Sequence, residues 1–173
     1  MGKSMMNITK RPLNIEAYTD GSAKNNGKKN AVGGWAFVVV VNGEIVYADH
    51  FYNFAEPTNQ KMELHAALTA CSYLDLRFTS FDFFTIYSDS AYLVNCVNQK
   101  WYNKWLENGW KNSKGEDVSN KAYWVDLIKY FDDPRFIFEK VKGHSDCEYN
   151  NIVDELAQSA AEEGRKILEN CNS

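Results

Sequence analysis

The stretch Ala17-Tyr18-Thr19-Asp20-Gly21-Ser22 decides how the rest of the chain is interpreted. Polar and apolar residues alternate from Leu13 to Thr19, which predicts a strand with one buried face. This strand is expected to end on the carboxylate of Asp20, where Gly21 and Ser22 favour a tight turn that lets a ligand approach the backbone. Taken alone, Asp-Gly after a strand indicates only a turn, so its meaning depends on the segments that follow.

Composition is typical of one globular domain. The chain has 173 residues, of which 45% are hydrophobic and 14% aromatic, enough to bury a sizeable core. We expect a single domain over residues 1–173, with a short N-terminal extension at 1–11 and a C-terminal tail at 166–173. The net charge of −4 argues against binding nucleic acid through bulk charge alone.

Neither a membrane span nor a secretion signal is expected. No apolar run approaches the length of a span, and the first residues lack the apolar segment of a signal peptide. The four cysteines are scattered, which is typical of reduced thiols. The sequence therefore predicts a cytoplasmic protein.

Alternation and turn signals predict the element order βββαβα, a short tryptophan-rich segment, then αβα. The later strands are expected at 34–41, 44–52, 81–88 and 135–142, with a hairpin at Asn42-Gly43 between the first two of these. Helices are expected at about 60–76, 91–98, 120–131 and from 151 onward. Thr58 or Asn59 should cap the first helix, and Ser119 or Asn120 the third. This order predicts an α/β fold in which helices cover a mixed sheet.

Four acidic residues should converge at one edge of that sheet. Chain direction makes the third, fourth and fifth strands parallel to the first, so Asp20, Asp89 and the loop after the fifth strand reach the same edge. Neighbouring strands lie roughly 4.8 Å apart, which makes Asp20 and Asp89 close neighbours. Glu63 and Asp154 lie in the early turns of helices that start there.

Clustered carboxylates raise each other's pKa unless a cation neutralises them, and hard oxygen ligands prefer Mg²⁺ or Mn²⁺. A pair of such ions suits in-line displacement at a phosphodiester. Each residue also fits a simpler role by itself: a solvated charge for Glu63, a helix cap for Asp89, a helix-dipole charge for Asp154 and a plain loop histidine for His144.

Five segments, in order, resemble the type 1 ribonuclease H family. They are Tyr18-Thr19-Asp20-Gly21-Ser22, residues 58–67, Tyr87-Ser88-Asp89-Ser90-Ala91-Tyr92, Val141-Lys142-Gly143-His144-Ser145 and residues 151–157. The resemblance covers the chain from about Leu13 to Arg165. It implies the ribonuclease H-like fold, a five-stranded mixed sheet in the order 3-2-1-4-5 flanked by helices. It also implies a metal-dependent endoribonuclease that hydrolyses the RNA strand of RNA–DNA hybrids and leaves 5′-phosphate and 3′-hydroxyl ends. We expect this enzyme to be a monomer.

The resemblance also implies roles for individual residues. Asp20, Glu63, Asp89 and Asp154 would hold two Mg²⁺ ions, with Mn²⁺ as an alternative and Asp20 shared by both ions. His144 would assist proton transfer or product release. Substrate contacts are implied as well. Gly21 and Ser22 would lie beside the RNA backbone, and Asn26, Asn59 and Gln60 would lie in the minor groove. Thr58 and Asn120 would hold a DNA phosphate, and Tyr92, Trp101 and Ser113 would lie along the DNA strand. The amides among them also fit turn formation and capping.

The sequence departs from this family in two places and leaves two alternatives open. Glu56 stands where some relatives place an arginine for phosphate, and Ala91 replaces a frequent glutamine. From Asn98 to Lys121, five lysines and three acids give a net charge of +2, which predicts a modestly basic nucleic-acid surface. The alternatives on the same fold are a non-catalytic nucleic-acid-binding module and a nuclease of the DNA transposase, integrase or resolvase type.

Overall fold

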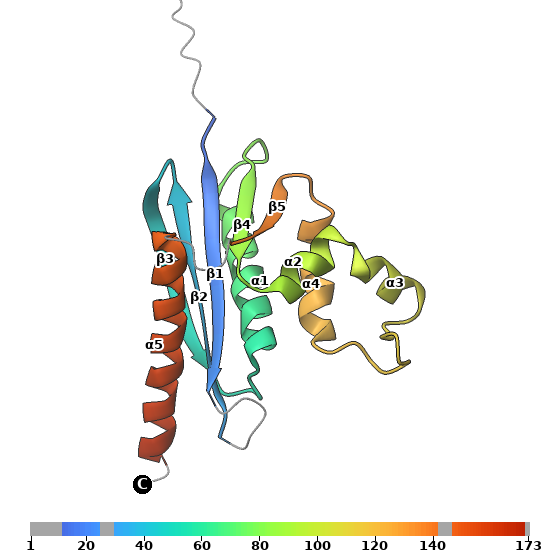
Figure 1. Ribbon diagram of the computed structural model, residues 1–173. Coiled ribbons are helices and arrows are strands. Elements are labelled where there is room, and N and C mark those ends of the chain that lie inside the picture. The colour runs from blue at the N-terminus through green and yellow to red at the C-terminus, as the bar shows by residue number, and fades with distance from the viewer. Residues whose placement is uncertain (1–11, 25–29, 142–146, 172–173) are drawn as a thin grey trace, which may run out of the picture.

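Five strands form a mixed sheet in the order β3-β2-β1-β4-β5, as predicted. The computed structural model describes residues 12–24, 30–141 and 147–171 (Figure 1). The strands are β1 (Ile15–Lys24), β2 (Val32–Val41), β3 (Glu44–Asn53), β4 (Phe84–Ser88) and β5 (Phe136–Lys140). β1, β2 and β3 pair antiparallel, whereas β4 pairs parallel with both β1 and β5.

Helices cover both faces of this sheet. They are α1 (Asn59–Arg77), α2 (Ala91–Asn98), α3 (Trp101–Glu107), α4 (Lys121–Phe131) and α5 (Glu148–Cys171). α5 packs on one face against β1, β2 and β3, and α1 packs on the other (Figure 1). α2, α3 and α4 extend the molecule past β5, so the sheet has a helical protrusion on one side.

Strand alternation separates the core into two layers. In β1, Ile15 and Ala17 join the larger cluster beneath α1, whereas Tyr18 joins the cluster beneath α5. One stripe of α1 faces this core, because four residues at helical spacing are fully buried: Met62, Ala66, Ala70 and Leu74. The larger cluster continues through Trp105 and Trp124, so the protrusion shares the core of the sheet.

The prediction that the first strand ends in a tight turn is wrong. β1 continues through Asp20 to Lys24, and Gly21 pairs with Trp35 of β2. A Cβ on Gly21 would lie 2.2 Å from the backbone nitrogen of Glu63 and 2.3 Å from the carbonyl carbon of Met62. The glycine is therefore needed because the backbone of α1 packs directly on β1, and not because the chain turns there.

Several other boundaries differ from the sequence prediction. β4 starts at Phe84 because Thr79 and Asp82 form a turn, in which an Asp82 carboxylate oxygen accepts the Thr79 N–H at 2.8 Å. α5 begins at Glu148, a few residues earlier than expected. Thr58 caps α1 as predicted, with its hydroxyl accepting the Lys61 N–H at 3.1 Å.

Asn120 is the N-cap residue of α4, as predicted, but it does not cap the helix through its side chain. Asn120 precedes α4 in a left-handed conformation with φ of 60°, and its side chain makes no capping hydrogen bond. The helix starts instead on backbone hydrogen bonds from Tyr123 and Trp124 to the Asn120 carbonyl. Asparagine suits this position because it tolerates left-handed backbone better than most residues.

No helix in the described part of the chain has the length and apolarity needed to cross a membrane. All four cysteines are free thiols, as predicted, and Cys71 and Cys96 are buried.

Candidate active site

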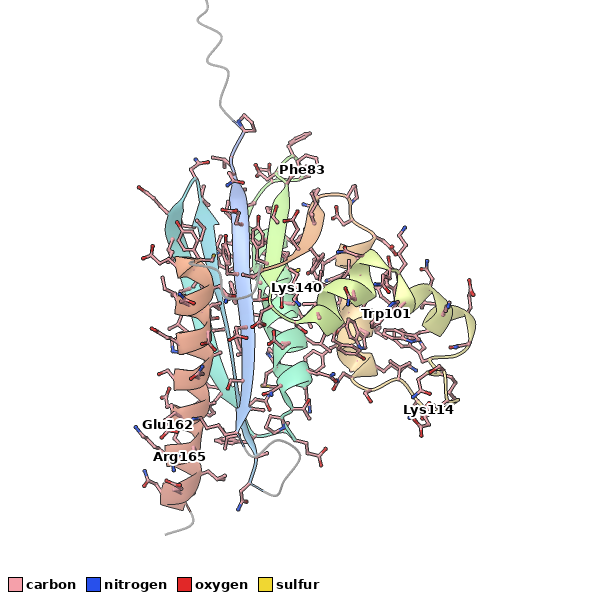
Figure 2. All side chains as sticks on the ribbon, viewed as in Figure 1. Phe83, Trp101, Lys114, Lys140, Glu162 and Arg165 are labelled. Carbon is pink, nitrogen blue, oxygen red and sulfur yellow. The ribbon has the colours of Figure 1, made fainter. Side chains whose placement is uncertain are left out.

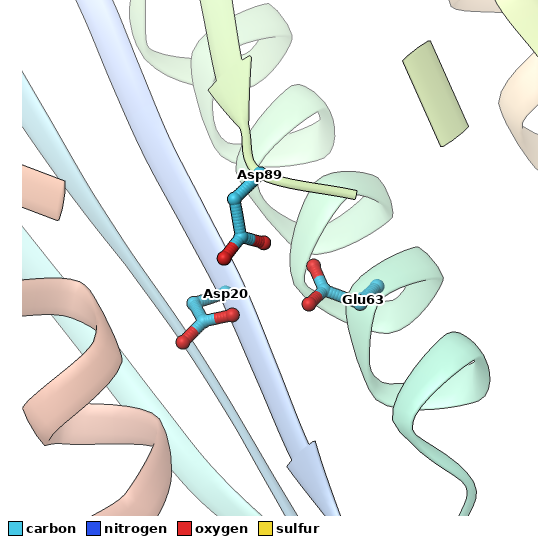
Figure 3. Close-up of side chains that lie close together, drawn as sticks. All are labelled: Asp20, Glu63 and Asp89. Carbon is cyan, nitrogen blue, oxygen red and sulfur yellow. The ribbon is translucent and has the colours of Figure 1, made fainter. Parts of the chain in front are cut away.

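Three carboxylates meet at the sheet edge where β4 ends. Asp20 comes from β1, Glu63 from the second turn of α1, and Asp89 directly follows β4 (Figure 3). One oxygen from each lies within 4.8 Å of the other two. Asp20 is 6% exposed and Glu63 9%, whereas Asp89 is open to solvent.

Sheet register and close helix packing produce this convergence. Thr19 of β1 pairs with Ser88, the last residue of β4, so Asp20 and Asp89 are the next residues on neighbouring parallel strands. This confirms that the two acids are close neighbours. The close approach of α1 at Gly21 then brings Glu63 to the same point.

The fold holds the two buried acids where their charge is unfavourable. The pKa of Asp20 is raised to about 7, chiefly by burial; the hydrogen bond from Glu63 lowers it, nearby Asp89 and Asp154 raise it, and the Gly21 N–H lowers it. Burial, with the charges of Asp20 and Asp89, also raises the pKa of Glu63 well above its usual range. No lysine or arginine in the described segments forms an ion pair with these three carboxylates.

This donor set fits a divalent cation. All the converging atoms are carboxylate oxygens, which hard ions such as Mg²⁺ and Mn²⁺ prefer. Two of the three acids are buried without a compensating cation from the described protein, which is costly unless an ion is bound or a proton is taken up. A bound cation would remove that cost.

The structure places Asp154 beside this group and not within it. Asp154 lies in the second turn of α5, half-buried, and one of its carboxylate oxygens accepts a hydrogen bond from Gln158 at 2.8 Å. Its contact with Asp20 is a hydrogen-bonding one, and it contributes to the raised pKa of Asp20. The predicted fourth carboxylate thus neighbours the three that converge.

Two of the predicted site residues, Asn26 and His144, lie outside the described residues.

A hollow of about 740 Å³ lies in the helical protrusion. Four predicted substrate contacts line it: Gln60, Tyr92, Trp101 and Ser113. Three lysines of the predicted basic segment also line it: Lys100, Lys104 and Lys111. The wall is completed by residues that were not predicted to contact substrate: Gln99, Trp105, Asn108, Asn112, Val118 and Ser119. Figure 2 labels Trp101 on this side of the molecule and Lys114 on the loop beyond it.

Aromatic packing and one hydrogen bond shape the hollow. The Trp101 indole N–H donates to the side-chain oxygen of Gln99 at 2.9 Å, which fixes the ring. Tyr92 lies 6.0 Å from Trp101 and 5.3 Å from Trp124, centroid to centroid. Trp105 both packs in the core and lines the hollow, so its packing role does not exclude a contact role.

Most of the remaining predicted contacts lie around the C-terminal part of β1 and the start of α1, whereas Asn120 lies at the start of α4. Asn59 accepts the Ala23 N–H through Oδ1 at 2.8 Å, so this side chain ties α1 to β1. Ser22 lies within β1 opposite Gly34. Thr58 and Asn120 precede α1 and α4, which pack against each other.

Sequence reasoning overlooked Ser88. Its side chain is fully buried, and its hydroxyl donates to a Glu63 carboxylate oxygen at 3.4 Å. The sequence signal was a hydroxyl residue directly before Asp89, but only the packing of α1 on the sheet brings it to Glu63.

Comparisons with known proteins give a consistent result. A family model described as RNase H matches residues 12–162. The chain is 39% identical over 150 residues to a Ribonuclease H of Clostridium botulinum, covering 84% of this chain and 94% of that one. It is 41% identical over 149 residues to a Ribonuclease H of Chlorobaculum parvum, covering 86% and 96%.

Solved structures share the fold. One is LC9-RNase H1, described as a type 1 RNase H with the type 2 active-site motif, with a TM-score of 0.72 at 24% identity over 88% of this chain and 74% of that one. Another is LC11-RNase H1 in complex with RNA/DNA hybrid, with a TM-score of 0.61 at 20% identity over 86% of this chain and 97% of that one.

Proposed function

The chain belongs to the ribonuclease H family, and on that basis we propose that it is an endoribonuclease that hydrolyses the RNA strand of RNA–DNA hybrids. The products would carry 5′-phosphate and 3′-hydroxyl ends. One observation carries the proposal most directly: the oxygens of Asp20, Glu63 and Asp89 lie within 4.8 Å of one another, and two of these acids are buried without a cationic partner among the described residues.

We assign the cation-binding role to Asp20, Glu63, Asp89 and Asp154. Two divalent ions bound there would activate the attacking water and stabilise the leaving oxygen of an in-line displacement. Asp20 interacts with Glu63 and Asp89 and also with Asp154, so its carboxylate is suited to bind both ions. His144, which follows β5 in the chain, would assist proton transfer or product release.

The hybrid would be recognised through its shape and its 2′-hydroxyl groups, because general cleavage excludes reading of base sequence. Asn59 and Gln60 stand at the start of α1, one turn before Glu63, where short amides would reach the minor groove. The hollow lined by Tyr92 and Trp101 would take the DNA strand, and Thr58 and Asn120 would hold one of its phosphates. Binding of RNA/DNA hybrid by LC11-RNase H1, which shares the fold, supports this substrate.

Cleavage of labelled duplexes tests the proposal. Wild-type protein with Mg²⁺ should cut RNA–DNA and leave RNA–RNA and DNA–DNA intact, and a chelator should stop the reaction. Asp20→Asn should lose cleavage while remaining folded, whereas Asp126→Asn, an exposed acid on α4, should cut like wild type. Equal cutting of all three duplexes, or cutting by Asp20→Asn at the wild-type rate, would overturn the assignment.

We propose further that residues 1–173 form one domain, that the enzyme is a monomer and that it acts in the cytoplasm. Four free cysteines, two of them buried, support a reducing compartment. Sedimentation at micromolar concentration tests the monomer, and a dimer mass would overturn it.

A further inference from the structure

We propose that Ser88 is a positioning residue, whose buried hydroxyl holds the Glu63 carboxylate and the Asp89 backbone in the geometry that a divalent cation requires. The inference rests on the proposed function, because it assumes that these acids bind a cation. Ser88 itself would touch neither the cation nor the substrate.

The Ser88 hydroxyl forms two hydrogen bonds, one to a residue of α1 and one to the residue that precedes α2. It donates to Oε2 of Glu63 on α1 at 3.4 Å, and it accepts the Ser90 N–H at 3.1 Å. Ser88 is 0% exposed and Glu63 is 9% exposed, so water has little access to replace the hydrogen bond between them. The bond to Glu63 becomes charge-assisted, and therefore stronger, when that carboxyl is ionised.

These bonds belong to a longer chain of hydrogen bonds that fixes Asp89. The Ser90 hydroxyl accepts the Leu93 N–H at 3.3 Å and so caps α2. The Ser88 carbonyl accepts the Val141 N–H at 3.0 Å, just after β5. Asp89 lies between these two serines, so its backbone is held on both sides while its carboxylate stays exposed.

One hydroxyl thus connects two of the converging acids. Loss of the Ser88 hydroxyl would leave the Ser90 N–H without this partner and would remove one of the hydrogen bonds that orient Glu63, which also interacts with Asp20 and the Gly21 backbone. Groups that orient metal ligands in this way typically contribute tenfold or more to metal affinity, on the order of 10- to 100-fold. The register partner Thr19 provides a contrast: it is equally buried, but its hydroxyl donates to the Tyr87 carbonyl at 3.3 Å and not to an acid.

The test compares Ser88→Ala with Thr19→Val, each of which removes one buried hydroxyl from the same level of the sheet. Calorimetric titration of the substrate-free proteins with Mg²⁺ measures metal affinity, and thermal melting in chelator measures stability. Ser88→Ala should bind Mg²⁺ about tenfold more weakly, whereas Thr19→Val should bind it like wild type at a similar loss of stability. Ser88→Thr, which keeps the hydroxyl, should restore most of the affinity. Ser88→Cys, of similar shape but with a weak donor, replaces the alanine variant if that variant does not fold.

Cleavage assays provide the second readout. Ser88→Ala should need about tenfold more Mg²⁺ for half-maximal cleavage, with an unchanged KM for hybrid. Unchanged Mg²⁺ affinity in Ser88→Ala, or equal losses in Ser88→Ala and Thr19→Val, would overturn the positioning role while wild-type cleavage stands. A wild-type protein that neither binds Mg²⁺ nor cuts hybrid would instead overturn the proposed function, and this inference with it.

Discussion

Asp20 is an acid that the fold holds where its negative charge is unfavourable. Its pKa is about 7 in the folded protein, against 3.8 for an ordinary aspartate. The folded state therefore binds a proton that the unfolded state has lost at neutral pH, so stability falls as the pH rises from about 4 to about 7. A divalent cation would reverse this effect by stabilising the ionised form.

The first prediction follows from this loss of stability with rising pH. In chelator at pH 8, Asp20→Asn should raise the free energy of unfolding by about 2 to 4 kcal/mol, because one pKa unit corresponds to about 1.4 kcal/mol. The gain should shrink as the pH falls toward 5. Urea unfolding of both proteins at the two pH values measures it, and saturating Mg²⁺ should reduce the difference. A mutant less stable than wild type at pH 8 would contradict the burial argument.

Asn59 gives a second prediction at a single residue. Its Oδ1 accepts the Ala23 N–H, and its amide N–H groups are the donors it can offer to a ligand. Asn59→Asp keeps the acceptor and suits the positive end of α1, but it removes the donors. Its melting temperature should match or exceed that of wild type, while the KM for hybrid should rise about tenfold at unchanged kcat. An unchanged KM would exclude Asn59 as a donor to substrate.

Close packing between elements decides where Glu63 stands. The Cβ of Gly21→Ala would meet backbone atoms of Met62 and Glu63, which cannot move without shifting α1. We expect this variant to lose about 1 to 3 kcal/mol of stability and about a hundredfold in kcat, because small misplacements are costly in a reaction centre.

Gly43→Ala is a suitable control for this third prediction. Gly43 has a φ of +86° in the β2–β3 hairpin, but a Cβ there would meet nothing within 4 Å. That variant should lose stability through backbone strain and cut hybrid at the wild-type rate. Thermal melts and single-turnover cleavage of the two variants separate the effects, and wild-type kcat in Gly21→Ala would contradict the packing argument.

The same elements show what sequence can and cannot predict. Periodicity and turn signals predicted the strands, and the helices other than α3, to within a few residues, because alternation and capping are local properties; α3 was expected only as a short tryptophan-rich segment. They missed the extension of β1 past Asp20, because Asp-Gly-Ser indicates a turn locally and only pairing with residues 32–35 of β2 makes it a strand. The link from Ser88 to Glu63 was out of reach for the same reason, since it depends on a helix 25 residues away in sequence.

Charge across the whole molecule determines how the protrusion would meet a hybrid. The chain carries a net charge of −4, so the lysines of the protrusion act against an acidic background. Lys104 lines the hollow and is exposed, whereas Lys111 forms an ion pair with Asp117 at 2.7 Å. Asp117 therefore offsets part of the charge that Lys111 would offer to a phosphate.

The fourth prediction concerns salt dependence. Lys104→Ala should reduce the slope of log affinity against log salt by about one, since each neutralised phosphate contributes nearly one. Lys111→Ala should reduce it less, and Asp117→Asn should tighten binding and steepen the slope. Fluorescence anisotropy with labelled hybrid in the Asp20→Asn background measures these slopes without cleavage. Equal slopes for the two lysine variants would contradict the offset by Asp117.

The sequence was most informative about the arrangement of the whole molecule. The meeting of Asp20, Glu63 and Asp89 was predicted correctly, because chain direction and parallel crossovers bring Asp20, the end of β4 and the start of α1 to one edge of the sheet. The strand order 3-2-1-4-5, which the resemblance to the ribonuclease H family implied, is also confirmed. The hollow was predicted only in part. Its wall needs Lys111, Asn112 and Val118 beside Trp101, and that arrangement depends on the path of the loop from Gly109 to Val118, which local pattern does not specify.

The tryptophans around the hollow make the protein its own optical probe. Trp101 lines the hollow, and Trp105, Trp110 and Trp124 pack in a continuous aromatic group beside it, whereas Trp35 stacks on His65 under α1. Four of the five indoles in the chain thus report on one region, and only Trp101 is both partly exposed and placed to meet a ligand there. Intrinsic emission should change when that region is filled and should lose most of this response in Trp101→Phe. Association with unlabelled nucleic acid can then be timed in chelator, separately from bond cleavage.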